Sequence, residues 1–172
     1  YFDDETTYPS AYLAGRITDS VAPRLAQSFA EIRAAAPNAQ VFVVGYPQVA
    51  PDGATDACFT EPTTPDAVPY SGVDLQFLHD IEQQLDDTIE AAAVAANFTF
   101  IPTWDQTAGH TLCTPEPWIN GITLYINTSS DCDPGYLPAD SEKWVCVKLG
   151  ALHPDEGGVL EIANIVEQAV TD

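Results

Sequence analysis

The run VFVVGYP at residues 41–47 restricts the fold of this chain more than any other feature. Its first four residues are apolar and three of them are β-branched, which is typical of a short strand buried on both faces. Such a strand needs neighbouring strands on both sides and a covering layer on each face, because bare apolar edges are unfavourable. The run therefore predicts a central position in a parallel sheet.

Two amphipathic segments flank this run. The first extends from residue 19 or 20 to residue 36, with Pro23 in its first turn, where a missing N–H is harmless. The second extends over residues 74–96 and leads into FTFIP at 98–102, another short strand. The order helix, strand, loop, helix, strand predicts an α/β domain with a parallel sheet. The expected inner faces are Val21, Leu25, Phe29 and Ile32 in the first helix, and Phe77, Leu78, Ile81, Leu85, Ile89 and Ala92 or Ala93 in the second.

The remaining segments are less regular. Residues 48–72 form a loop that is long for a compact domain, and residues 103–150 contain all three Trp with one expected strand at 122–126. Open α/β proteins build their sites in loops that follow parallel strands, so these loops are the expected surroundings of a site. A last helix is expected over residues 155–170. Its inner face would carry Val159, Ile162 or Ala163, Val166, and Ala169 or Val170.

The composition of the chain limits its possible fold and partners. With 172 residues and 45% hydrophobic content, the chain can bury one core, which indicates a single globular domain. Its 26 Asp and Glu against 5 Lys and Arg give a net charge of -21, which repels phosphate backbones and makes nucleic acid a poor partner. No apolar run approaches the roughly 20 residues of a membrane span, so none is expected.

The four cysteines predict disulfides rather than a metal site. They form no CxxC pair, and no His stands at ligand spacing from them, so a metal site is not expected. We favour Cys58 with Cys113 and Cys132 with Cys146 among the three possible pairings. The sequons at Asn97 and Asn127 fit a secreted, extracellular glycoprotein.

The predicted sheet is incomplete, because only one other strand is confidently expected beside residues 41–47. Either another chain or a missing N-terminal segment should complete it. The chain starts at Tyr1 without Met or a signal-peptide pattern, so we expect a processed or trimmed piece of a longer protein.

Three motifs in order carry a resemblance to a known family. They are APNAQVFVVGYPQVAP, then FTFIPTWDQTAGHTLCTPEPWING, then LHPDEGG before a helix. This series resembles the C-terminal two-thirds of a secreted SGNH (GDSL-type) esterase or lipase of the actinobacterial sort, from Val21 onward. The resemblance implies a three-layer α/β/α flavodoxin-like fold, of which residues 1–172 would be the C-terminal portion of one domain.

The same resemblance implies a serine ester hydrolase that acts on acyl esters or lipids without a cofactor. His153, in GALHPDEGG, would be the general base that takes the proton from the serine nucleophile. Without the family context, a lone histidine beside a helix would more often be a capping or packing residue. Phe59, Tyr70, Trp104 and Trp118 would suit a lipid or aryl substrate but could equally be core, and the substrate-binding residues stay unknown.

The family's nucleophile block, Gly-Asp-Ser-x-x-x-Gly, is absent, together with the Gly and Gly-x-Asn segments of the oxyanion hole. No serine of the chain has a strand-to-helix turn with flanking glycines; they are Ser10, Ser20, Ser28, Ser71, Ser129, Ser130 and Ser141. The nucleophile is therefore expected from a preceding segment or a second, companion chain. If the chain is complete, a non-catalytic SGNH-like binding module is the alternative, and a carbohydrate-binding domain is a weaker one.

The triad acid is also missing. Family members often carry Asp three residues before the catalytic His, where this chain has Gly150. The Gly150 carbonyl is our candidate for orienting His153, in a Ser-His dyad, although a carboxylate elsewhere stays possible. We expect Asp155 to cap the last helix instead. His110 is expected to pack the loop beside Cys113 and Trp118, and His79 to be at the surface or partly buried.

Overall fold

A computed structural model describes residues 10–56, 58–59, 69–121, 124–126, 145–147 and 150–171. The first described element is a long helix made of α1 (Ser10–Arg16), a π-helical turn η1 (Ile17–Val21) and α2 (Ala22–Ala35). The expected start at residue 19 or 20 is therefore wrong, since the helix begins at Ser10. Pro23 has no N–H and its ring would clash with the preceding turn, and the wider π turn accommodates it without ending the helix.

The central sheet consists of β1 (Phe42–Val44) and β4 (Thr99–Ile101), which are parallel, with Val43 opposite Phe100. Gly45 N–H extends the ladder to the Ile101 carbonyl at 2.9 Å. The run at 41–47 was expected to be buried on both faces, and this is wrong within the described residues: Val44 is 41% exposed. The reason is that β1 has one described strand neighbour rather than two.

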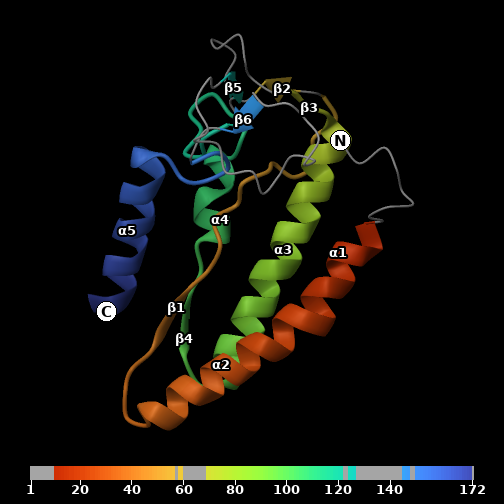
Figure 1. Ribbon diagram of the computed structural model, residues 1–172. Helices are drawn as coiled ribbons and strands as arrows, with labels where there is room; N and C mark the ends of the chain where they lie inside the picture. The colour runs from red at the N-terminus through yellow and green to blue at the C-terminus, as the bar shows by residue number, and fades with distance from the viewer. Residues whose placement is uncertain are drawn as a thin grey trace.

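Helices lie on both sides of this strand pair (Figure 1). On one side is α3 (Gly72–Ala95), packed against α2, and on the other is α5 (Glu156–Thr171). This arrangement confirms the expected α/β class with a parallel sheet. In α5 the expected inner-face residues Val159 and Val170 are at least half exposed. The described element that α5 contacts most is the short strand β4, which covers only part of the helix surface.

The inner face of α3 also differs from the expected one. Its buried residues include Leu75, His79, Glu82, Asp86 and Ala93. The expected face, with Phe77, Leu78 and Ile81, is only partly buried. Polar residues take the buried face because it meets the backbone of the segment that follows β1.

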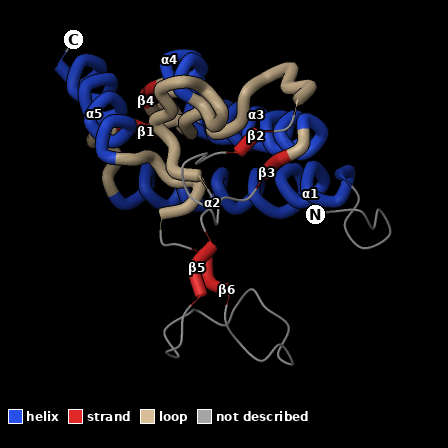
Figure 2. The backbone as a smooth tube through the Cα atoms, turned by 90° about the horizontal axis from the view of Figure 1, so that it is seen from above, coloured by secondary structure: helices blue, strands red, loops and turns tan. Residues whose placement is uncertain are grey.

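Short elements complete the fold. Helix α4 (Trp104–Thr107) and the 3₁₀ turn η2 (Ala108–His110) follow β4, and β2 (Cys58–Phe59) pairs with β3 (Pro69–Tyr70). The strand expected at 122–126 is confirmed as β5 (Leu124–Ile126), which pairs with β6 (Val145–Val147) away from the helices (Figure 2).

The disulfide Cys58–Cys113 is confirmed, with 5.9 Å between the Cα atoms. It ties β2 to the segment after η2. The expected Cys132–Cys146 pair lies outside the described residues, except for the backbone of Cys146. Of the two sequons, Asn97 is exposed directly after α3, and Asn127 lies outside the described residues.

Candidate active site

His153 lies on an exposed turn immediately before α5. The turn closes with a hydrogen bond from the His153 backbone N–H to the Gly150 carbonyl, at 3.0 Å. Gly150 has a φ of 91° and Leu152 a φ of 62°, so two of the residues before His153 have left-handed backbone. A left-handed Leu is uncommon and costs energy, which requires that neighbouring contacts hold the turn.

Asn120 supplies those contacts. Its backbone N–H and its side-chain amide donate to the His153 carbonyl oxygen at 2.9 and 3.0 Å, and its own carbonyl accepts from Leu152 N–H at 2.9 Å. A bridge between Ile119 and Pro154 continues the pairing. The segment 119–120 therefore fixes the backbone on both sides of the imidazole.

Asp155 caps α5, as expected. Its side chain accepts from Gly158 N–H at 2.8 Å, and its backbone N–H donates to the Trp118 carbonyl at 2.8 Å. Gly158 lies so close to this segment that a Cβ there would be 2.5 Å from the Trp118 carbonyl oxygen. The start of α5, and with it His153, is thus packed directly on the Trp118 backbone.

The orientation of the imidazole stays a prediction. The Gly150 carbonyl accepts the backbone N–H of His153, and no hydrogen bond from the His153 ring to another described residue is recorded. The nucleophile is likewise not placed: of the serines whose side chains are described, Ser71 caps α3, while Ser20 and Ser28 lie on η1 and α2 in the helical layer opposite α5 (Figure 1).

His110 has the positional role that was expected. Its ring stacks on Trp118, with the centroids 3.7 Å apart and the planes 2° apart. Its Nδ1 lies 2.8 Å from the Glu116 carbonyl, an acceptor, which requires the proton on Nδ1. Trp118 N–H in turn donates to the His110 carbonyl at 2.9 Å. His110 therefore fixes the loop that carries Trp118.

His79 is buried, with 6% of its surface exposed, so the expected surface or partly buried position is wrong. Its Nδ1 lies 3.1 Å from the Gln48 side-chain amide and 3.2 Å from the Ala50 carbonyl. With a proton on Nδ1 the ring donates to Ala50, and without it the ring accepts from Gln48. The ring also packs on Trp104 with centroids 5.4 Å apart.

Two carboxylates on α3 are buried, which the sequence analysis did not predict. Glu82 accepts hydrogen bonds from Val49 N–H and Ala50 N–H, both at 3.2 Å, and Asp86 accepts from Tyr46 N–H at 2.6 Å. Burial raises the pKa of Glu82 to about 7, against the effect of these two hydrogen bonds, and it also raises the pKa of Asp86. Glu82 and Asp86 follow His79 by three and seven residues, and this spacing places all three on one helix face. The spacing could have indicated a shared polar face from the sequence.

The aromatic residues considered for the substrate have mixed positions. Tyr70 and Trp118 are partly buried, Trp104 packs on His79, and the Phe59 side chain is not described. Burial, followed by the charges of Asp74 and Glu82, raises the pKa of Tyr70 to about 12. Tyr70 packs against the core rather than forming an open platform.

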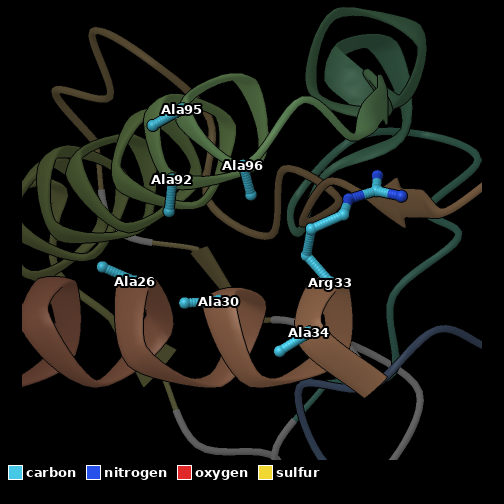
Figure 3. A pocket seen from close by; sticks show the side chains of 7 residues that line it. All are labelled: Ala26, Ala30, Arg33, Ala34, Ala92, Ala95 and Ala96. Atoms are coloured by element: carbon cyan, nitrogen blue, oxygen red, sulfur yellow. The ribbon is translucent and has the colours of Figure 1, made fainter. Parts of the chain in front are cut away.

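A groove of about 500 Å³ lies between α2 and α3 (Figure 3). Its polar side chain is Arg33, whose guanidinium donates to the Ala39 and Asn97 carbonyls at 2.8 and 3.0 Å and stacks over Phe98. The rest of the lining is alanine: Ala26, Ala30, Ala34, Ala92, Ala95 and Ala96. Arg33 is thus engaged in tying α2 to the end of α3.

Within the described ranges, no three His, Cys, Asp or Glu side chains are grouped so that they could hold a metal ion. None of the described helices is both long enough and apolar enough to cross a membrane.

Comparison with known proteins relates the chain to bacterial lipases. Lipase 2 of Streptomyces coelicolor (strain ATCC BAA-471 / A3(2) / M145) is 30% identical over 91 residues, which make up 53% of this chain and 29% of that protein. Over about half of its length, the chain is similar to a Streptomyces lipase. This confirms the resemblance inferred from the sequence motifs, although no protein-family model matches the chain.

Two solved structures are similar to the chain in fold. The extracellular lipase from Streptomyces rimosus matches with a TM-score of 0.59 and 21% identity, over 91% of this chain and 55% of that one. Phospholipase A1 from Streptomyces albidoflavus NA297 matches with a TM-score of 0.60 and 17% identity, over 91% and 56%. The chain therefore spans about half the length of these structures, and less than a third of Lipase 2.

Proposed function

We propose that this chain is the C-terminal portion of a secreted SGNH-type serine ester hydrolase and that His153 is its general base. The observation that carries the proposal is the His153 turn: an exposed imidazole on a strained backbone that Asn120 holds through three hydrogen bonds. Strain that the surroundings maintain is a feature of functional sites. The relation to Streptomyces lipases supports the reaction class.

The reaction would be acyl transfer to water. The serine oxygen attacks the ester carbonyl while His153 accepts the serine proton, and the protonated imidazole then donates to the leaving alcohol. Water releases the acyl group from serine in a second step by the same base. The Gly150 carbonyl, or a carboxylate from outside the described residues, would orient the ring; acyl esters or lipids would be the substrates.

The nucleophile would come from a companion segment, either a preceding part of the same chain or a second chain of the same precursor. Two observations support it. Val44 in β1 is 41% exposed, with β4 as the described partner strand of β1, and the chain covers only about half of the lipase structures. A companion segment that adds strands beside β1 would complete a three-layer SGNH sheet and supply the serine.

A fluorophosphonate probe tests the hydrolase. The native material is labelled, separated under reducing and non-reducing conditions, and analysed by intact mass and by N-terminal sequencing of every species present. A labelled serine on a polypeptide that co-purifies with this chain, or precedes it, is expected. A lone species of 18.5 kDa that folds cooperatively and takes no label would contradict the proposal.

The second candidate function is a non-catalytic SGNH-like binding module. It is favoured by the serines whose side chains are described, since Ser71 is engaged in capping and Ser20 and Ser28 lie in the opposite layer from α5. The same labelling separates the two candidates, because a binding module gives no labelled serine in any co-purifying species.

A further inference from the structure

The buried carboxylate of Glu82 is unexplained by the proposed reaction. It is only 7% exposed, and the structure records no ion pair between it and any described Lys or Arg. Burying a carboxylate in this way is unfavourable unless hydrogen bonds compensate. Its recorded hydrogen bonds are those from the backbone N–H groups of Val49 and Ala50, so Glu82 fixes the path of the chain at these two residues.

The fixed backbone at Val49 leads to the His153 turn through the core. The Val49 side chain forms a buried cluster with Leu112 and Ile119, and Leu152 packs against this cluster. The Val49 carbonyl also accepts Leu112 N–H at 2.8 Å. Leu152 immediately precedes His153, and Ile119 precedes Asn120, so both anchors of the turn contact the Val49 cluster.

We propose that Glu82 is a positioning residue for His153, which it holds in place through Val49 and the cluster against which Leu152 packs. The inference rests on the proposed function, because it assigns Glu82 to the same site. Glu82 does not touch the reacting atoms. Its effect is to keep the left-handed Leu152 turn in the one arrangement that Asn120 binds.

The hold of Glu82 on this backbone depends on pH. Burial raises the pKa of Glu82 to about 7, so the folded arrangement favours the protonated side chain over the carboxylate. Openings of the chain that expose Glu82 therefore become easier as the pH rises through this value. The titratable groups on the elements packed around Glu82 are His79 and Asp86 on α3, Asp52 in the segment after β1, Tyr70 on β3 and Asp105 on α4.

Hydrogen exchange on the native protein, with any co-purifying chain present, tests the positioning directly. Protection factors of the Asn120 and Leu152 amides are measured from pH 6 to pH 8 in the wild type, in Glu82→Gln and in Asp87→Asn. Asp87 is an exposed carboxylate on the same helix and serves as the control. We expect wild-type protection of both amides to fall from pH 6 to pH 8 as Glu82 ionises, Glu82→Gln to remove this fall and to lie about tenfold below the wild type at pH 6, and Asp87→Asn to follow the wild type.

A second variant covers the case in which Glu82→Gln destabilises the whole chain. Val49→Ala keeps the carboxylate and removes the side chain that contacts the cluster. It should lower protection at Leu152 while the Ala50 amide keeps its wild-type value. If both variants change protection only at residues 49 and 50, Glu82 holds its own loop and nothing more, and the proposal is wrong.

Ester hydrolysis by the same preparations separates this inference from the proposed function. With a p-nitrophenyl ester, Glu82→Gln should lower kcat by about tenfold and leave KM unchanged, as expected for a misplaced base. A wild-type kcat in Glu82→Gln at all pH values would overturn the positioning role. If the wild type hydrolyses no ester, the proposed function fails, and the exchange data alone decide the role of Glu82.

Discussion

Asn120 holds the His153 carbonyl oxygen twice, through its backbone N–H and through its side-chain amide. Asn120→Ala removes only the second of these bonds. We expect kcat of the assembled enzyme to fall by about tenfold with little change in KM, because the base is displaced while the substrate contacts stay. The unfolding free energy should fall by about 1 kcal/mol. Steady-state kinetics and urea unfolding check both values.

The control for this change is Asn164→Ala, at an exposed asparagine of α5 that bonds only the side chain of Glu161 within the described region. It should leave kcat and stability close to the wild type. Equal losses in the two variants would show that the amide of Asn120 has no particular role.

His153 and Asp155 are two residues apart but should respond oppositely to substitution. His153→Ala removes the proposed base and should cost several orders of magnitude in kcat/KM of the assembled enzyme. Asp155→Asn keeps a side-chain oxygen that can accept Gly158 N–H, so activity should stay within about threefold and stability within about 0.5 kcal/mol. A large activity loss in Asp155→Asn would instead identify it as the missing triad acid.

At the scale of elements, the carboxylates of α3 give stability an unusual pH dependence. Burial raises the pKa of Glu82 from 4.5 to about 7, so the folded chain holds a proton that the unfolded chain releases between these values. The unfolding free energy should therefore fall as the pH rises from about 4.5 to 7, by about 3 kcal/mol from this group. Asp86 acts in the same direction. Chemical denaturation across this range measures the slope.

Glu82→Gln identifies the source of that slope, because the amide does not titrate. The variant should lose most of the decline between pH 4.5 and 7. Asp87→Asn, which changes an exposed carboxylate, should keep it. A wild-type slope in Glu82→Gln would assign the decline to other groups.

Gly45, which directly follows β1, allows the chain to pass close to Phe100 of β4 and Asp86 of α3. A Cβ at Gly45 would be 2.7 Å from the Phe100 ring and 2.8 Å from the Asp86 carboxylate. Gly45→Ala should therefore cost about 1–3 kcal/mol of unfolding free energy. Gly15→Ala is the matched control in α1, where nothing lies within 4 Å of the new Cβ, and it should stabilise the chain by about 0.5–1 kcal/mol. Thermal unfolding of the two variants compares them.

Elements whose ends carry local signals were predictable from the sequence. Helix α3 begins within two residues of the expected start, where Ser71 and Asp74 form a capping box, and α5 begins after the cap at Asp155. The early start of the first helix was not predictable, because the π turn before Pro23 keeps the helix continuous where a proline normally suggests a boundary. The pattern of apolar and polar residues does not indicate a π-helical turn.

The buried polar face of α3 was beyond sequence reasoning for a different reason. Glu82 and His79 are buried because the backbone of residues 48–50 crosses them, and that path depends on the tertiary fold. Hydrophobic periodicity selected the face with Phe77 and Ile81 instead, and that face is only partly covered. The cap at Asp155 and the packing of His110 were predictable because they depend on neighbours close in sequence.

At the scale of the whole molecule, the exposed side of β1 is where the companion segment should bind. Val44 is 41% exposed beside a sheet with one described partner strand, whereas Val94, 64% exposed, lies near the end of α3. A charged side chain is costly only where it becomes buried. Val44→Lys should thus weaken association with the companion segment by tenfold or more, since burying an unpaired charge costs at least about 1.4 kcal/mol. Val94→Lys should have no effect on association. Co-purification and fluorophosphonate labelling measure both variants, and equal labelling of Val44→Lys and the wild type would place the companion elsewhere.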